Sequence, residues 1–185
     1  WLGDCPPEQL RRMPEAMKRV EAVRNFRLAR KSPSTRKLAD TPTRFHVTNI
    51  PNSNYLVIPE VSSERRHYIP IGYIEPETLS SNLIKIVPNA RLYHFGVLTS
   101  EMHMSWVRHV CGRLESRYRY SKDIVYNNFP WPEKPTAAQV KAVEVAAQGV
   151  LDARKNHPGA TLADLYDPNT MPPDLVRAHQ TLDKA

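Results

Sequence analysis

The segment LESRYRYS, residues 114–121, places a charged side chain at every second position from 115 to 119. In an extended strand alternate side chains point to the same face, so Glu115, Arg117 and Arg119 would lie together. An arginine donates two parallel hydrogen bonds to O6 and N7 of guanine, and a carboxylate accepts one from N4 of cytosine. This face could therefore recognise a G·C base pair. From spacing alone, the alternative is a cross-strand salt bridge on a solvated sheet face.

The sequence lacks the motifs of a catalytic or metal centre. None of its six glycines forms the G-x-G turn of a methyl-donor site. The string NFPW, residues 128–131, has the wrong order for the loop that grips a flipped base, so we expect Phe129 and Trp131 to pack between two lobes. His103 and His109 are six positions apart, without a paired metal motif. We expect no catalytic residue, no cofactor and no metal in this segment.

Positive charge is concentrated in the first two-thirds of the chain. The 185 residues carry a net charge of +7, with 20 Lys and Arg against 12 Asp and Glu in residues 1–130, and 6 against 7 in residues 131–185. Because cations that contact phosphates release condensed counterions, a basic domain with a near-neutral appendage is typical of a polyanion-binding protein. Many ordinary domains reach a similar charge, so this pattern alone does not define the partner.

Cysteine and hydropathy patterns favour a cytoplasmic protein without a membrane span. No apolar run approaches the roughly 18 residues needed to cross a bilayer. Cys5 and Cys111 lie far apart and match no metal-ligand spacing, which indicates two unlinked thiols in a reducing compartment. Because the chain begins at Trp1 and has no basic-then-apolar leader, we expect it to be part of a longer polypeptide.

Residues 14–31 are predicted to form a helix, because Pro14 suits a first turn and neither Gly nor another Pro follows. Arg24, Arg27 and Lys31 are spaced by three and four residues, which would align them on one helix face. These cations could contact phosphates, or they could form a solvated outer face.

Several short runs rich in β-branched and aromatic residues are predicted to be strands. They are FHVTNI (45–50), NYLVIP (54–59), HYIPIGYI (67–74), NLIKIV (82–87) and RLYHFGVL (91–98). Their close spacing favours an antiparallel or mixed sheet over βαβ units, and Pro70 suggests an edge strand or a bulge. The polar break that contains Ser62, Ser63, Arg65 and Arg66 is either a phosphate-contacting loop or a solvated turn.

The remaining segments are predicted to be mainly helical. Ser100 can cap a helix that runs to Cys111 and ends at Gly112. After the proline-rich connector YNNFPWPEKP, Thr136 and Gln139 can form a capping box for a helix that ends near residue 156. Two further helices are expected in LADLYDP and in PPDLVRAHQTLDKA.

Together these elements predict an α+β fold, with a mixed or antiparallel-sheet recognition lobe, flanking helices and a small C-terminal helical lobe. We expect a basic helical lead-in over residues 1–40. The recognition domain would then span residues 41–130, and the C-terminal helical domain residues 131–185.

Long strings of the chain resemble the target-recognition and C-terminal regions of the MmeI-like family of single-chain restriction and modification enzymes. These strings are SERRHYIPIGYI, LYHFGVLTSEMHMSWVRHVCGRLESRYRYS, YNNFPWPE and TLADLYDPNTMPPDL. The resemblance covers the chain from about residue 45 onward. It implies an upstream S-adenosylmethionine-dependent adenine methyltransferase domain, often preceded by an endonuclease, and double-stranded DNA as the partner of this segment.

The resemblance also implies which side chains choose the bases. The aligned positions are Glu60, Asn82, Glu115, Arg117 and Arg119. Phosphate contacts are expected from Arg24, Arg27, Lys31, Arg65 and Arg66. The alternative function is a stand-alone RNA- or protein-interaction module, although neither an RNP-type aromatic motif nor a Gly-x-x-Gly loop is present.

Overall fold

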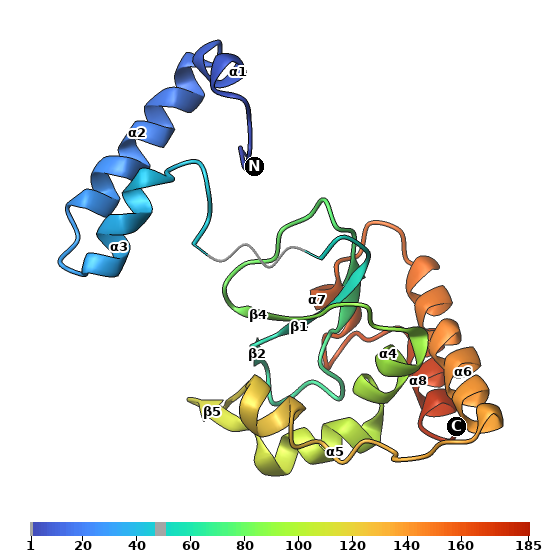
Figure 1. Ribbon diagram of the computed structural model, residues 1–185. Helices are drawn as coiled ribbons and strands as arrows, with labels where there is room; N and C mark the ends of the chain where they lie inside the picture. Colours follow the sequence, from blue (N-terminus) through green and yellow to red (C-terminus); the bar gives the residue numbers. More distant parts are fainter. Residues whose placement is uncertain (1, 47–50) are drawn as a thin grey trace. The chain divides into compact units, whose positions relative to one another are not determined.

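The computed structural model describes residues 2–46 and 51–185, which belong to two compact units. We call residues 1–50 the N-terminal unit and residues 51–185 the main unit. Figure 1 shows the N-terminal unit in blue and the main unit from teal to red. The last four residues of the predicted strand 45–50 lie outside the described residues, and its first two, Phe45 and His46, are not in a strand.

Over its described residues, the N-terminal unit contains three α-helices that begin at prolines and one short 3-10 helix. It contains α1 (Pro7–Arg11), α2 (Pro14–Leu28), α3 (Pro33–Lys37) and the 3-10 helix η1 (Leu38–Asp40). Proline is favoured at a helix start, because its missing N–H would have no intrahelical partner there. The predicted helix over residues 14–31 is therefore confirmed, but it ends three residues early.

Two small antiparallel sheets form the β part of the main unit. The strands are β1 (Tyr55–Pro59), β2 (Val61–Ser62), β3 (Gly72–Ile74), β4 (Ile84–Val87), β5 (Gly112–Leu114) and β6 (Arg117–Arg119). The first sheet has the order β3-β1-β4 and the second the order β2-β6-β5. The strand at residues 67–74 is shorter than predicted; β3 is an edge strand, and Pro70 lies just before it.

The main unit also contains helices, which loops connect to one another and to the strands. They are α4 (Leu92–Leu98), α5 (Glu101–Val110), the π-helix η2 (Lys122–Tyr126), α6 (Ala137–Lys155), α7 (Leu162–Leu165) and α8 (Pro173–Leu182). The predicted caps are confirmed, because the Ser100 hydroxyl accepts from the His103 N–H and Thr136 and Gln139 form a capping box. Mixed helices and antiparallel strands confirm the predicted α+β class.

The prediction of a strand over residues 91–98 is wrong, because this segment is helix α4. Tyr93 and the four residues from Phe95 to Leu98 are all buried, so the segment has neither the period of a half-buried strand nor that of an amphipathic helix. The prediction that Gly112 terminates α5 is also wrong. The helix ends at Val110, Cys111 has an extended backbone, and Gly112 is the first residue of β5.

One hydrophobic core is shared by the sheets and the helices of the main unit. Leu56 of β1, Phe95 of α4, Val107 of α5, Val150 of α6 and Leu175 of α8 are fully buried within it. Helices α6 and α8 run side by side, as Figure 1 shows. The C-terminal helices therefore support the strands directly, and a division at residue 130 would separate elements that pack on the same core.

Two buried histidines should make the stability of the main unit depend on pH. Burial lowers the pKa of His103 to about 4, and burial together with the nearby charge of Arg154 lowers the pKa of His179 to about 3. In an unfolded chain both rings titrate near pH 6.5. Below this pH the unfolded chain binds more protons, so we expect the free energy of unfolding to fall as the pH drops from about 6.5 to about 4.

Urea unfolding between pH 7.5 and pH 4 would measure this dependence. We expect His103→Gln and His179→Gln each to reduce the slope of the free energy of unfolding against pH. Each variant removes one group that takes up about one proton when the chain unfolds. Slopes that match those of the unchanged protein in both variants would contradict the assignment.

Candidate nucleic-acid interface

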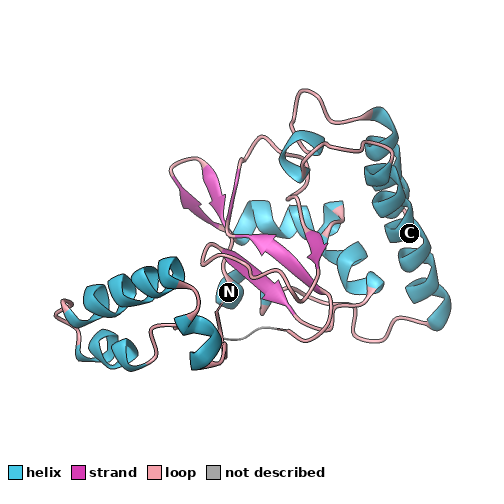
Figure 2. Cartoon of the chain, turned by 90° about the horizontal axis from the view of Figure 1, so that it is seen from above, coloured by secondary structure: helices cyan, strands magenta, loops and turns pink. Residues whose placement is uncertain are grey.

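The segment expected to be one continuous strand is a β-hairpin. Strands β5 and β6 pair with Leu114 opposite Arg117, so Glu115 and Ser116 form the turn. Figure 2 shows the two strands projecting from the main unit. Glu115 has a φ of 58°, in the left-handed region that non-glycine residues rarely adopt. A two-residue hairpin turn requires a positive φ of this kind, and this turn contains no Gly or Asn that would signal it.

Strand β6 carries the alternation that the spacing predicted. Tyr118 is 3% exposed and points to the protein interior, whereas the side chains of Arg117 and Arg119 are 45% and 42% exposed. Tyr120, two residues further on, is also buried. In one continuous strand the same alternation would place Leu114 on the face of Tyr118, but Leu114 is exposed, because it lies on the other strand of the hairpin.

Glu115 and Arg117 form an ion pair at the tip of the hairpin. The Arg117 Nη2 lies 2.6 Å from Glu115 Oε2, and the Glu115 side chain is 77% exposed. An exposed pair of this kind stabilises a fold by only about 0–1 kcal/mol. This salt bridge joins a turn residue to the strand that follows it, rather than two strands as the alternative interpretation expected. It contributes little stability and leaves both groups accessible to a partner.

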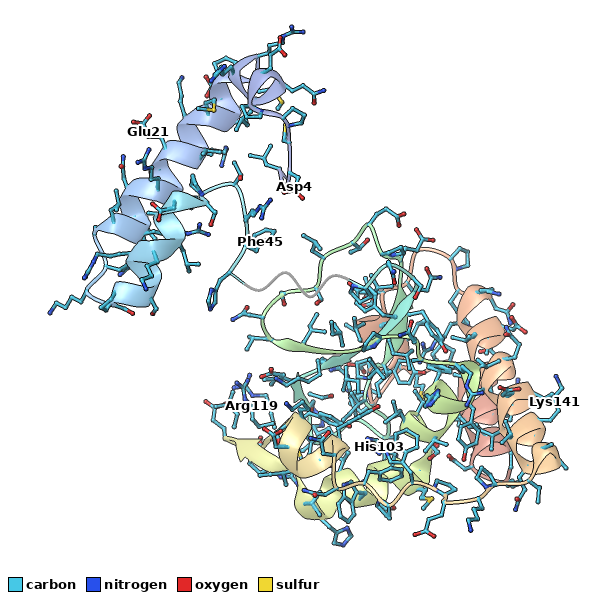
Figure 3. The ribbon with its side chains drawn as sticks, viewed as in Figure 1. Asp4, Glu21, Phe45, His103, Arg119 and Lys141 are labelled. Carbon is cyan, nitrogen blue, oxygen red and sulfur yellow. The ribbon has the colours of Figure 1, made fainter. Side chains whose placement is uncertain are left out.

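A second charged cluster lies where the two sheets meet. Glu60 connects β1 to β2; its N–H donates to Leu83 O at 2.9 Å, and its C=O accepts from Tyr120 N at 2.7 Å. The Glu60 carboxylate contacts Lys85 Nζ at 2.5 Å and Arg119 Nη2 at 3.1 Å. Arg119, labelled in Figure 3, therefore joins the base of the hairpin to the first sheet.

Asn82 lies close to this cluster along the chain. It is exposed in the turn that precedes β4, next to Leu83, whose carbonyl bonds to Glu60. The structure thus brings Glu60 and Arg119 into contact, and Asn82 precedes Leu83, the residue whose carbonyl accepts from the Glu60 N–H. Glu115 and Arg117 form a separate pair further along the same hairpin.

The cations predicted to contact phosphates differ in whether their side chains are exposed or already bound within the protein. Arg27 donates to the carbonyls of Leu38, Thr41 and Arg44 at 2.7, 2.9 and 2.8 Å, so it holds the N-terminal unit together. Arg24 is exposed on α2. Lys31 lies beyond the end of that helix, so the predicted helix face with three aligned cations is wrong.

Arg65 and Arg66 connect their loop to the C-terminal part of the main unit. Arg66 Nε donates to Tyr166 O at 3.1 Å, and Arg65 Nη2 to Asn169 Oδ1 at 3.2 Å. Their side chains therefore have a structural role that sequence reasoning did not anticipate.

The aromatic connector packs as predicted. Phe129 is 4% exposed, and its ring lies at 5.3 Å from that of Trp131 and at 4.7 Å from that of His103. Tyr93 of α4 and Val140 of α6 belong to the same cluster. Phe129 and Trp131 thus lie in a cluster that joins α4 and α5 to the C-terminal helix α6.

Sequence reasoning missed two cations near the hairpin. Lys85 is the one charged residue in the apolar strand β4, which is a signal that could have been noticed. Arg113 stacks on Tyr118, with its guanidinium carbon 4.2 Å from the ring centroid. For metal binding, residues 2–46 and 51–185 contain no group of three or more His, Cys, Asp or Glu side chains arranged to hold an ion.

An α+β unit with accessible guanidinium and carboxylate groups on a projecting hairpin has the features of a nucleic-acid recognition domain. The family model described as "MmeI, target recognition domain" matches residues 1–133, and "MmeI, C-terminal domain" matches residues 135–185. The chain belongs to the MmeI family and comprises these two domains.

Two relatives cover the chain almost completely. "DNA methyltransferase A" of Bacillus subtilis (strain 168) is 42% identical over 183 residues, which are 99% of this chain and 21% of that protein. A solved structure of the type IIL restriction-modification enzyme MmeI in complex with DNA is 48% identical, with a TM-score of 0.94 over 100% of this chain and 24% of that one. The chain thus spans about a fifth to a quarter of the relatives' length. None of its described helices is both long and apolar enough for a bilayer span.

Proposed function

We propose that this chain recognises a specific double-stranded DNA sequence, as the target recognition part of a larger DNA methyltransferase. The observation that carries the proposal is the match of the whole chain, at 48% identity and a TM-score of 0.94, to an enzyme whose structure was solved with DNA. The larger protein would transfer a methyl group from S-adenosylmethionine to an adenine N6 in another domain. This segment would hold neither the donor nor the catalytic residues.

The hairpin and the Glu60 cluster would enter the major groove, where each base pair presents a distinct pattern of donors and acceptors. Glu115 and Arg117 could then recognise one base pair, while Asn82 and Arg119 contribute to others and Glu60 acts through the cations that it binds. Backbone phosphates would fix the register through basic side chains. The free thiols of Cys5 and Cys111 support a reducing, cytoplasmic location.

The distribution of positive charge along the chain supports a separate phosphate-binding role for the N-terminal unit. Residues 1–50 carry 11 Lys and Arg against 5 Asp and Glu, whereas residues 51–130 carry 9 against 7. Sequence-independent attraction to DNA would therefore come mainly from the N-terminal unit, and base selection from the main unit.

Selection of duplexes from a random pool by the full-length protein tests the proposal. We expect the retained duplexes to share one defined sequence, and single-stranded RNA to compete poorly. Arg24→Ala and Lys31→Ala should weaken binding to all duplexes alike and reduce the slope of log affinity against log salt by about 0.9 for each phosphate that is no longer neutralised. Retention of duplexes without a common sequence would contradict the proposal.

Arg27→Ala is the comparison variant, which separates loss of a cation from loss of structure. It removes a cation from the same helix, but it also removes three hydrogen bonds to carbonyls. We therefore expect it to lower the thermal stability of the N-terminal unit, which Arg24→Ala should not do.

A further inference from the structure

Glu60 is a buried carboxylate whose two oxygens are both occupied. Its side chain is 9% exposed, with Oε1 at 2.5 Å from Lys85 Nζ and Oε2 at 3.1 Å from Arg119 Nη2. A carboxylate withdrawn from water is costly unless cations or donors pair with it. Glu60 therefore depends on both cations, and little of it is accessible to a base.

The two cations, in contrast, remain accessible. The side chains of Lys85 and Arg119 are 38% and 42% exposed. An ammonium has three N–H donors and a guanidinium has five, so a single ion pair leaves donors unused on each. The surface of this cluster consequently presents hydrogen-bond donors and a net positive charge.

The backbone fixes the three side chains relative to one another. Lys85 comes from β4 of the first sheet and Arg119 from β6 of the second. Glu60 bonds through its backbone to residues beside both strands, Leu83 and Tyr120. The two cations are therefore held at a defined separation, as recognition of a base edge requires.

We infer that Lys85 is a specificity-determining residue, and that Lys85 and Arg119, held by Glu60, together select guanine. The inference rests on the proposed function. In the major groove guanine presents two acceptors, O6 and N7, whereas the exocyclic amino groups of cytosine and adenine are donors. A surface of donors suits guanine and leaves a facing amino group unpaired. Glu60 is then a positioning residue that acts through the two cations.

Selection from a random duplex pool by full-length Lys85→Met tests this inference. Methionine keeps most of the length of the lysine side chain but removes its charge and its donors. We expect the retained duplexes to show a preference for guanine that is at least tenfold weaker at one base pair and unchanged preferences elsewhere. Lys85→Arg should retain the preference, and Glu60→Gln should weaken it at the same base pair.

Lys155→Met is the matched control, because Lys155 is also ion-paired but lies on α6 with a side chain 73% exposed. Retention of every base preference by Lys85→Met would overturn the inference while leaving the proposed function intact. If the unchanged protein selects no sequence, the proposed function itself fails. Lys85→Met leaves the buried Glu60 carboxylate with one cation instead of two, which could lower the unfolding temperature. In that case the double variant Glu60→Gln with Lys85→Met removes the carboxylate charge as well. We expect the double variant to show the same weakening of the guanine preference.

Discussion

Exchanging Glu115→Lys together with Arg117→Asp in the full-length enzyme is expected to change the recognised base pair and to leave methylation intact. The substitution reverses the charges at the hairpin tip, so a donor replaces the acceptor and an acceptor replaces the donors. One good bidentate contact discriminates against a wrong base by about 1–3 kcal/mol, so the affinity for the original site should fall roughly tenfold to a hundredfold. Sequencing of methylated sites and of retained duplexes would measure the change.

The fold should tolerate this exchange. The pair is exposed and the substitutions preserve an ion pair of opposite polarity. The matched control is Asp152→Lys with Lys155→Asp, which reverses an exposed ion pair on α6. We expect this control to leave the recognised sequence unchanged. An enzyme that carries the exchange at 115 and 117, keeps its activity and still methylates the original sequence would refute the role of this pair.

Substitution of Gly96→Val is expected to destabilise the main unit by about 1–3 kcal/mol or more, because it overpacks the contact between α4 and α6. A Cβ at residue 96 would lie 2.7 Å from Val143 Cγ1 and 3.1 Å from Ala147 Cβ. Real Cβ atoms essentially never lie as close as 2.7 Å to another heavy atom, so the Val143 side chain or one of the two helices must shift. Thermal unfolding should show a lower midpoint, by roughly 5–10 °C.

Gly149 provides the comparison, since it also lies inside a helix. A Cβ built there meets no atom of the described chain within 4 Å, so Gly149→Ala should gain up to about 1 kcal/mol from helix propensity alone. Adding Val143→Ala to Gly96→Val removes the methyl group that clashes and should restore part of the stability. A Gly96→Val protein as stable as the unchanged one would contradict the close packing of these two helices.

The sequence predicted those elements whose ends carry explicit signals. Ser100 and the pair Thr136 and Gln139 identified the starts of α5 and α6 through side-chain capping. Helix α4 was missed because it is buried on nearly all sides and has no polar face to reveal its period. The turn at Glu115 and Ser116 was missed because Glu115 occupies the position of positive φ at which Gly or Asn would signal a hairpin turn.

The candidate site was predictable only in part. The alternating charges of residues 115, 117 and 119 indicated the accessible side chains of the hairpin, and the resemblance added Glu60 and Asn82. The contacts of Glu60 with Lys85 and Arg119 could not be predicted, because they depend on the pairing of β1 with β4 and on the approach of β6 from the second sheet. Likewise, composition cannot tell an arginine such as Arg27, whose donors bind carbonyls of its own unit, from one that is available to DNA.

A structure of the full-length enzyme bound to its selected duplex would test most directly whether the hairpin recognises bases. We expect the guanidinium groups of Arg117 and Arg119 to lie within hydrogen-bonding distance, about 3 Å, of base edges in the major groove. A complex in which the hairpin faces solvent, or in which these two groups contact phosphates alone, would contradict the account.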